Sequence, residues 1–545
     1  MSEKTGALSN AGVLRAAVIV IFGFVASGVL GFVRTGAFSA TFGGDSAELD
    51  AFYAAQRIPE LLFVVVAGGA LGSAFIPVFA RYLKPESRDE AWRLASAVMT
   101  LSMAAAGVMA LIVAIFAPVI VPVVLTPGWS AEQQALTVSL TRILLITTVI
   151  FAASGLSMGI LNAHQSFLFP ALAASMYNVG LIVGALIIAR VLPAYSLAGD
   201  AAAMSTPANI YGLAYGAILG ASLHLLVQIP ALIKIRARLR PNFNRHTSGA
   251  GEVLTLMIPR VLGLAVVQIN FIVNVAFAST MVTGSQIALT TAWFLLFFTL
   301  GVLGQSVGTA VFPTLSALAA EGDMDGYKAR LASAMRGVLF LAIPASVGLI
   351  LLGESLVSVF ERGEWTREHT QATAWALTFF AVGMAGHGLL EILSRAFYAL
   401  ADTWTPVKIG IGAIIGNIIL SFIFIQFIGT PGSLTRGPFA GLALANSLTT
   451  LIESAVLWWL LRRRIGGLHD AAILRSSGRG ILATAVMAAI VLAVVAMLGD
   501  APQMVILFTG AAVGAVSFFV LAILMGMDEV SIITRRLPFL KARVG

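Results

Sequence analysis

Long apolar runs, separated by short polar connections, follow one another through most of this 545-residue sequence. A helix needs about 20 apolar residues to cross the hydrocarbon core of a membrane, and fourteen runs reach that length. The predicted spans lie at roughly 13–40, 51–82, 91–125, 136–162, 167–192, 208–234, 253–281, 287–318, 330–352, 370–400, 405–428, 437–461, 478–499 and 503–527. The pattern predicts an all-α membrane protein with about 14 transmembrane helices.

Short motifs of the first half of the chain recur in the second half at a nearly constant separation. Three pairs of segments carry this repeat: 72–80 with 308–316, 93–97 with 330–334, and 129–132 with 365–368. The register predicts that spans 1–6 were duplicated as spans 7–12. Because six is even, both copies enter the membrane from the same side, as parallel repeats. We therefore expect an N-terminal lobe over 1–245, a C-terminal lobe over 246–470, and a helix pair with a basic tail over 471–545.

Composition narrows the class of protein further. The chain is 59% hydrophobic and 11% charged, with a mean hydropathy of +0.96, whereas a soluble domain carries about 25% charged residues. It has no cysteine, which excludes disulfides and thiolate metal sites. The sequence shows no Gly-rich phosphate loop, paired catalytic carboxylates or nucleophile triad. An enzyme is therefore disfavoured, we expect no catalytic residue, metal or cofactor, and a coupling ion is left open.

Basic residues gather in the connections that follow even-numbered spans. They include Arg81, Lys84, Arg88 and Arg93 after the second span, Lys234, Arg236, Arg238, Arg240 and Arg245 after the sixth, and Arg462, Arg463, Arg464, Arg475 and Arg479 after the twelfth. Cationic loops stay in the cytoplasm, so both termini are predicted to be cytoplasmic. The net charge of +8 thus indicates topology, and no nucleic-acid partner is expected.

Arg34 is a charged residue within the first predicted span. An ionisable residue there costs at least about 2.5–3.5 kcal/mol on insertion scales, which makes it a functional candidate. Arg34 shares one helical stripe with Gly23, Ser27 and Gly31. Small residues mark a face that packs against protein or lines a cavity. We expect Arg34 to face a cavity, and the alternative is a side chain that snorkels to the outer interface.

The second span holds Arg57 and Glu60, which are three residues apart and can meet on one helix face. Pro59 lies between them and removes a backbone hydrogen bond, which favours a kink. Asp50 opens the span. Arg57 is a candidate for substrate binding, and Asp50 and Glu60 are candidates for gating or ion coupling. A structural ion pair near the outer surface is the alternative.

The seventh span places Arg260, Asn270 and Asn274 on one stripe. Polar side chains within a membrane need water or a polar partner, so these three are candidates for substrate binding. Polar contacts between neighbouring helices are the alternative.

The tenth span holds Glu391 and Arg395, four residues apart. We interpret them as a structural or gating pair, with ion coupling left open. His387 in the same span is expected to be a hydrogen-bonded core histidine rather than a ligand.

Spans 1, 2 and 7 therefore carry three arginines, Arg34, Arg57 and Arg260, drawn from both repeats. A guanidinium stays charged and its planar fork binds two phosphate oxygens at once. A cleft lined by these side chains would suit a phosphate-bearing substrate, and the repeat interface of a transporter is where such a substrate binds.

With these residues in hand, the chain resembles the MurJ (MviN) lipid II flippases of the multidrug/oligosaccharidyl-lipid/polysaccharide exporter superfamily. The matching segments are Ser27, Gly31–Arg34, Asp50–Phe52, Pro59, Gly69–Ala70, Ala74–Pro77, Gly301–Pro313 and Thr405–Lys408. The resemblance runs over essentially the whole chain. It implies two six-helix lobes around a cationic cavity, an undecaprenyl-diphosphate-linked disaccharide-pentapeptide as substrate, and a groove for the lipid tail between spans 13 and 14.

The resemblance also implies a multi-pass protein of the bacterial inner (plasma) membrane, surrounded by membrane lipids, with the cell-wall synthesis machinery as a candidate partner. Several basic or acidic positions that are typical of the family are apolar here. They are Gly28, Phe63, Gly68, and Leu295 or Leu296. Arg34 matches the family pattern, and we expect Arg57 and Arg260 to compensate for the missing arginines.

Two other functions stay open from the sequence. The chain could export another lipid-linked glycan, or cationic drugs, although three arginines argue against a cationic substrate. It could instead be a non-transporting scaffold in cell-wall assembly. A scaffold needs no polar cavity, so simultaneous loss of Arg34 and Arg260 would leave it working.

Overall fold

The computed structural model describes residues 10–66, 69–83, 85–197, 208–301 and 306–530. All the regular elements in these ranges are helices. Ten of these helices have the length and hydropathy of a membrane span, and a bent helix pair makes an eleventh candidate. The all-helical membrane fold that the sequence predicts is confirmed.

The first compact unit comprises Met1–Gln286 together with Arg362–Trp365. Its helices are α1 (Asn10–Phe42), α2 (Ala47–Val66), α3 (Gly69–Arg81), η1 (Pro85–Ser87), α4 (Arg88–Ile120), η2 (Val121–Leu125), α5 (Ala131–Ala163), α6 (Leu168–Val183), η3 (Gly184–Ile188), α7 (Ala189–Val191), α8 (Tyr211–Leu226), α9 (Ile229–Lys234) and α10 (Ala250–Ala278). α11 (Ser285–Leu300) begins at the end of this unit.

The second compact unit comprises Ile287–Glu361 and Thr366–Gly545. Besides most of α11, its helices are α12 (Ser306–Glu321), α13 (Met324–Val357), η6 (Ser358–Phe360), α14 (Arg367–Val382), α15 (Met384–Ala399), α16 (Trp404–Phe427), α17 (Phe439–Ile465), α18 (Asp470–Leu498) and α19 (Gln503–Leu524). These units are defined by packing. The predicted lobe boundaries at 245/246 and 470/471 are defined by the duplication, and they stay a prediction.

The duplication is visible in where the helices begin. Three helices of the first repeat have counterparts that begin at one and the same offset along the chain: α4 and α13 at Arg88 and Met324, α5 and α14 at Ala131 and Arg367, and α6 and α16 at Leu168 and Trp404. The residue that caps the start of the helix is also of the same kind in both copies of one such pair. Ser130 caps α5 by accepting a hydrogen bond from the backbone of Gln133, and Thr366 forms a capping box with His369 in front of α14.

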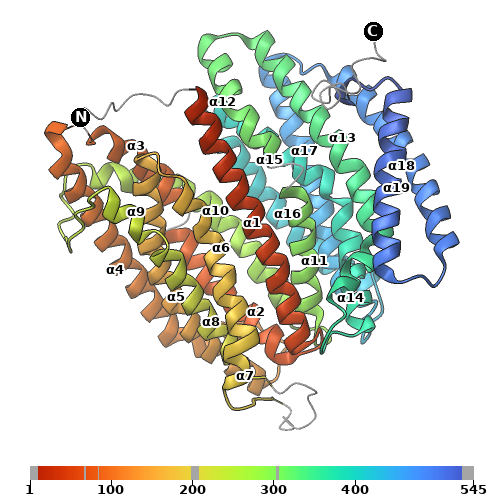
Figure 1. Cartoon of the computed structure of the whole chain (residues 1–545), viewed down its shortest axis with the longest axis horizontal. Coiled ribbons are helices and arrows are strands. Elements are labelled where there is room, and N and C mark those ends of the chain that lie inside the picture. The colour runs from red at the N-terminus through yellow and green to blue at the C-terminus, as the bar shows by residue number, and fades with distance from the viewer. Residues whose placement is uncertain (1–9, 67–68, 84, 198–207, 302–305, 531–545) are drawn as a thin grey trace. The chain divides into compact units, whose positions relative to one another are not determined.

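Close helix packing in the first unit depends on small residues. On α8, Gly216 and Gly220 face Gly180 of α6 and Gly184 of η3. The approach is so close that an added Cβ on Gly180 would lie 2.2 Å from the Cα of Gly220. Such faces let membrane helices approach without side chains between them. α1 runs alongside α6 in the same way (Figure 1), with Gly23 against the backbone of α6.

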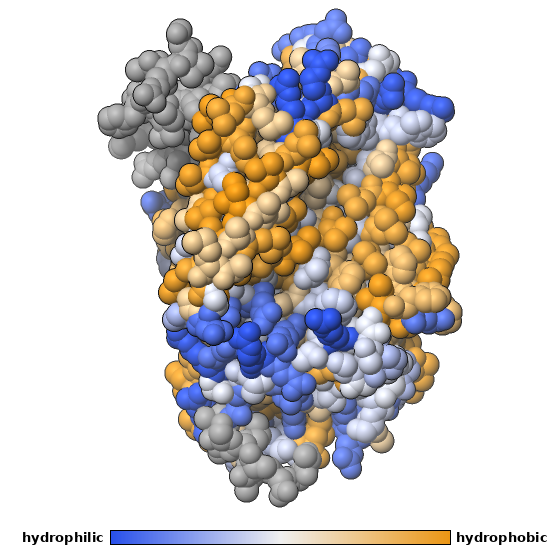
Figure 2. Space-filling view, turned by 90° about the vertical axis from the view of Figure 1, so that its right-hand side faces the viewer, coloured by the Kyte–Doolittle hydropathy of each residue, from blue (hydrophilic) through white to orange (hydrophobic). Residues whose placement is uncertain are grey.

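α18 and α19 pack against α13 at one side of the second unit (Figure 1). Their shared core includes Phe340 of α13, Met487 of α18 and Phe518 of α19. On this side of the molecule, apolar residues form a broad band between hydrophilic residues at its two ends (Figure 2). Large exposed side chains such as Leu482 and Phe508 belong to α18 and α19. A surface of this kind is stable when it faces lipid.

Candidate functional site

Arg34 is held on α1 by an amide of α6. Its Nη1 donates a hydrogen bond of 3.1 Å to Oδ1 of Asn178, and its Cζ lies 6.0 Å from the centroid of the Phe38 ring. The Nδ2 of Asn178 donates in turn to the Oγ and the carbonyl oxygen of Ser27, at 3.3 and 3.2 Å. The small-residue stripe that the sequence singles out on the first span therefore faces α6.

Arg57 and Glu60 form the ion pair that their spacing predicts, with 3.0 Å between Nη1 and Oε2. The side chain of Arg57 is 14% exposed and that of Glu60 is 43% exposed, so the guanidinium is the more enclosed partner. Its Cζ lies 5.0 Å from the ring centroid of Phe271 on α10, within cation–π range. Its buried Nε has no hydrogen-bond partner among the described residues.

Two tyrosines connect these charges into one neighbourhood. Tyr53 on α2 lies against Phe38, with ring centroids 6.2 Å apart, and Phe38 is the ring that Arg34 approaches. Tyr177 precedes Asn178 on α6 and lies within electrostatic reach of Glu60 and Arg34. The first unit thus gathers residues of α1, α2 and α6 into one polar cluster, within helices that are otherwise apolar.

Asp50 lies at the first turn of α2 and is 2% exposed. Its Oδ2 accepts a hydrogen bond of 2.7 Å from the backbone N–H of Gly284, which follows α10. Its charge also acts on Tyr53. Asp50 therefore connects the start of α2 to the α10–α11 turn.

α10 belongs to the same unit and carries Asn270 and Asn274 of the stripe predicted on the seventh span. Ile272 and Val275 belong to the same apolar cluster as Ile58 of α2, and Phe271 places the helix beside Arg57. The Oδ1 atoms of Asn270 and Asn274 are buried and lack a hydrogen-bond partner within the described ranges. A buried acceptor without a partner costs about 1–3 kcal/mol, so these amides suit a polar ligand or water.

Arg260, the third arginine of the prediction, lies on α10, but its side chain is outside the described residues. Its role stays a prediction.

The other predicted pair lies in the second unit and is not part of this cluster. Arg395 and Glu391 form an ion pair along α15, and Arg395 also donates to the Glu391 carbonyl at 2.7 Å. Glu453 of α17 lies in the same region, because Tyr398 is within electrostatic reach of Glu453 and of the pair. Its carboxylate would lie 3.3 Å from a Cβ on Gly410, so α16 approaches it closely.

His387 is the satisfied core histidine that the sequence predicts. It is 8% exposed and its Nε2 lies 3.2 Å from Oδ1 of Asn446. Trp293 and Phe297 enclose the ring, with centroids 5.5 and 5.7 Å away. The hydrogen bond and the ring contacts explain why a histidine is present in this helix.

The apolar residues at typical family arginine positions have structural partners of their own. Phe63 contacts Phe151, with ring centroids 5.2 Å apart. Leu295 and Leu296 are 1% and 0% exposed. These positions belong to packed helix contacts in this chain.

Sequence reasoning missed two polar residues within spans, Asn178 and Glu453. Each was visible as a polar residue in an apolar run, which is the available signal. The partners were not visible, because Asn178 lies 144 residues from Arg34 in the chain.

Comparison with known proteins agrees with this geometry over nearly the whole chain. The family model described as lipid II flippase MurJ matches residues 38–509. The lipid II flippase MurJ of Burkholderia cenocepacia is 31% identical over 456 residues, which cover 82% of this chain and 84% of the relative. The probable lipid II flippase MurJ of Bdellovibrio bacteriovorus is 29% identical over 530 residues, covering 96% and 97%.

Solved structures show the same fold. A lipid II flippase MurJ in an inward closed conformation superimposes with a TM-score of 0.74 at 24% identity, covering 94% of this chain and 99% of the other. An inward-facing multidrug resistance transporter of the MATE family superimposes with a TM-score of 0.65 at 16% identity, covering 83% and 99%. The matched family is one of transporters rather than enzymes, and the chain belongs to the lipid II flippase MurJ family.

Proposed function

We propose that this chain carries lipid II, an undecaprenyl-diphosphate-linked disaccharide-pentapeptide, from the inner to the outer leaflet of the bacterial inner membrane. The observation that carries the proposal is the Arg34 guanidinium, held within a spanning helix by the neutral amide of Asn178. A guanidinium stays charged and binds two phosphate oxygens in a fixed geometry. Arg34 is therefore the principal diphosphate ligand.

The neighbouring residues support a site with two parts, one for the diphosphate and one for the glycan or peptide. Arg57, enclosed beside Phe271, adds positive charge, and Arg260 is assigned the same role. The amides of Asn270 and Asn274 offer both donors and acceptors. Because phosphate oxygens only accept, the Oδ1 atoms of these amides, which have no partner among the described residues, suit the hydroxyl and N–H groups of a glycan or peptide.

The acidic residues are assigned to gating and coupling. Glu60 balances the charge of Arg57, and Asp50 joins α2 to the α10–α11 turn. In the second unit, Glu391 and Arg395 form a pair within α15, and we assign this pair to gating.

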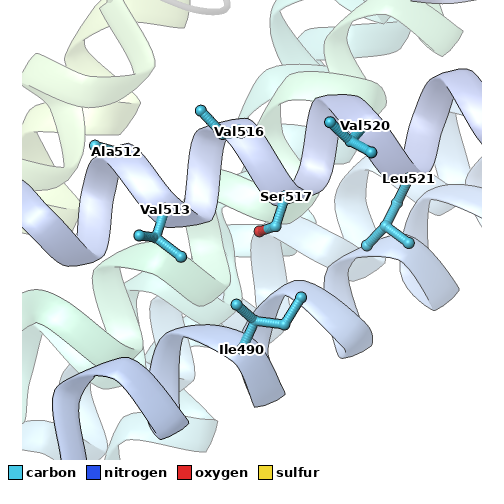
Figure 3. Close-up of a pocket in the computed structure, with 7 residues that line it drawn as sticks. All are labelled: Ile490, Ala512, Val513, Val516, Ser517, Val520 and Leu521. Carbon is cyan, nitrogen blue, oxygen red and sulfur yellow. The ribbon is translucent and has the colours of Figure 1, made fainter. Parts of the chain in front are cut away.

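A groove between α18 and α19 suits the polyprenyl tail. It has a volume of about 450 Å³ and is lined by Ile490 of α18 and by α19 residues that include Val513, Val516 and Val520 (Figure 3). Ser517 is the one polar residue in this lining. An apolar groove open to lipid lets a hydrocarbon chain bind at little desolvation cost.

The basic connections favour a cytoplasmic position for both termini. With that orientation, the lobes of the duplicated fold expose the site alternately to the two sides. Outward movement of an anion is favoured by an inside-negative potential, by about 2.3 kcal/mol per charge per 100 mV. We assign the membrane potential a driving role, with the cell-wall synthesis machinery as the protein partner.

The test uses the full chain in proteoliposomes with labelled lipid II, with and without a clamped membrane potential. We expect lipid II to reach the opposite leaflet with the wild-type chain but not with Arg34→Ala. Equal rates for the two would overturn the proposed function. Undiminished accumulation against a gradient at zero potential, with no ion gradient, would exclude the potential as the driver.

A further inference from the structure

The two ends of the Asn178 amide have different partners. Its Oδ1 accepts from the guanidinium of Arg34, and its Nδ2 donates to Ser27 and to the carbonyl oxygen of Ala174. The side chain is 7% exposed. One end of the amide therefore holds the cation while the other end is fixed to the backbones of α1 and α6.

A neutral residue with one acceptor and one donor is required at this point. Alanine would leave the guanidinium without this hydrogen bond. Aspartate has nearly the same shape, but its carboxylate would pair with Arg34 and repel the carbonyl oxygens of Ser27 and Ala174. The amide orients the cation without adding a charge of its own.

The second repeat offers an internal comparison. In the register of the duplication, position 34 corresponds to Asn270 and position 178 corresponds to Ile414. The copy that lacks the arginine thus also lacks the amide. This pairing indicates that Asn178 serves Arg34 rather than the common helix frame.

We propose that Asn178 is the positioning residue that fixes the direction of the Arg34 guanidinium without adding a charge of its own, and so favours the binding of a diphosphate at Arg34. The proposal rests on the proposed function, because it takes Arg34 as the diphosphate ligand. Its consequence is specific: a negative charge at position 178 should act against the anionic substrate through Arg34.

The test measures the affinity of the purified full chain for lipid II and the unfolding midpoint of each variant. We expect Asn178→Asp to bind at least about tenfold more weakly, since it places a carboxylate against the cation, and Asn178→Ala about threefold more weakly. Ser175→Ala is the matched control, because Ser175 is a buried neighbour on α6 whose hydroxyl has no partner among the described residues. It should bind like the wild type.

A double-mutant cycle separates positioning from structure. In an Arg34→Ala background, Asn178→Asp should cause little further loss, whereas a purely structural effect would be the same in both backgrounds. Equal loss in the two backgrounds, or wild-type affinity of Asn178→Asp, would overturn the inference. If Asn178→Asp does not fold, wild-type affinity of Asn178→Ala would overturn it. Wild-type affinity of Arg34→Ala would overturn the proposed function itself.

Discussion

The two copies of the repeat differ at two positions where the first copy carries an arginine. α1 and α10 end at Phe42 and Ala278, in the register of the duplication, so Arg34 of the first copy corresponds to Asn270 of the second. Arg57 likewise corresponds to Trp293, which packs against His387 in the second unit. Corresponding helices thus form with charged residues in one copy and with neutral ones in the other.

This difference separates folding from function. A charge within a spanning helix costs several kcal/mol, and the second copy builds its helices without these arginines. Formation of these helices therefore does not need a charge at the two positions. Their roles lie in the polar cluster of the first unit, and the comparison can be tested residue by residue.

The largest effect is expected from Arg34→Ala. Loss of the guanidinium removes the bidentate partner of the diphosphate, so flipping in proteoliposomes and complementation of a depleted strain should both be abolished. Arg34→Lys should be partly active, since a point charge lacks the fork geometry.

The matched control is Asn270→Ala at the corresponding position of the second copy. It should reduce the flipping rate by no more than about tenfold, because a neutral hydrogen bond contributes about 0.5–1.5 kcal/mol. A greater loss of flipping for Asn270→Ala than for Arg34→Ala would show that the second copy, and not the first, supplies the main contact to the substrate.

A smaller effect is expected from Arg57→Ala and Arg260→Ala. Each should lower the affinity for lipid II by about tenfold, because each removes one charge while Arg34 remains. Glu60→Gln tests whether positive charge at this position favours binding. Removal of the negative partner of Arg57 should not weaken the affinity for lipid II. Wild-type affinity of either alanine variant would show that this arginine does not replace a missing family arginine.

The third prediction concerns a helix that is continuous in one copy and bent in the other. α5 is continuous through Thr147, whereas the corresponding Gly383 separates α14 from α15 at a bend of 47°. Ser447 donates its hydroxyl to the carbonyl oxygens of Phe379 and Phe380 at this bend. A Cβ on residue 383 would lie 2.6 Å from the Cα of Ser447.

Gly383→Ala should therefore destabilise the protein by about 1–3 kcal/mol through overpacking. Gly348→Ala on α13 is the control, because a Cβ there meets nothing within 4 Å. Thermal unfolding in detergent checks both, and an equal midpoint for Gly383→Ala and the wild type would show that the close approach is not needed.

The sequence predicted the features that depend on local order and missed those that depend on distant contact. Apolar periodicity and the repeat register predicted the helical fold. The spacing of Arg57 with Glu60, and of Glu391 with Arg395, predicted ion pairs that form within one helix. The contact of Arg34 with α6 could not be predicted, because no local pattern specifies which helix a small-residue stripe will meet. The bend at Gly383 was missed for a similar reason, since its cause lies in α17.

The smallest expected effect lies at the turn between α15 and α16, where Asp402 corresponds to the uncharged Ser166 of the first copy. Burial raises the pKa of Asp402, but hydrogen bonds from Thr405 and Arg464 together outweigh it, so the pKa lies below its ordinary value. The folded state therefore favours the carboxylate. Its contribution to stability is present above the unfolded pKa of about 4 and is lost as the pH falls through the folded pKa.

Asp402→Asn should remove this dependence and cost at most about 1 kcal/mol at neutral pH, because the pair with Arg464 is partly exposed. The unfolding midpoint, measured between about pH 3 and pH 7, should fall more steeply with acid in the wild type than in the variant. Ser166→Ala in the first copy should leave the slope unchanged. Parallel curves for the wild type and Asp402→Asn would mean that this turn, like its uncharged counterpart, is stabilised by packing and backbone hydrogen bonds alone.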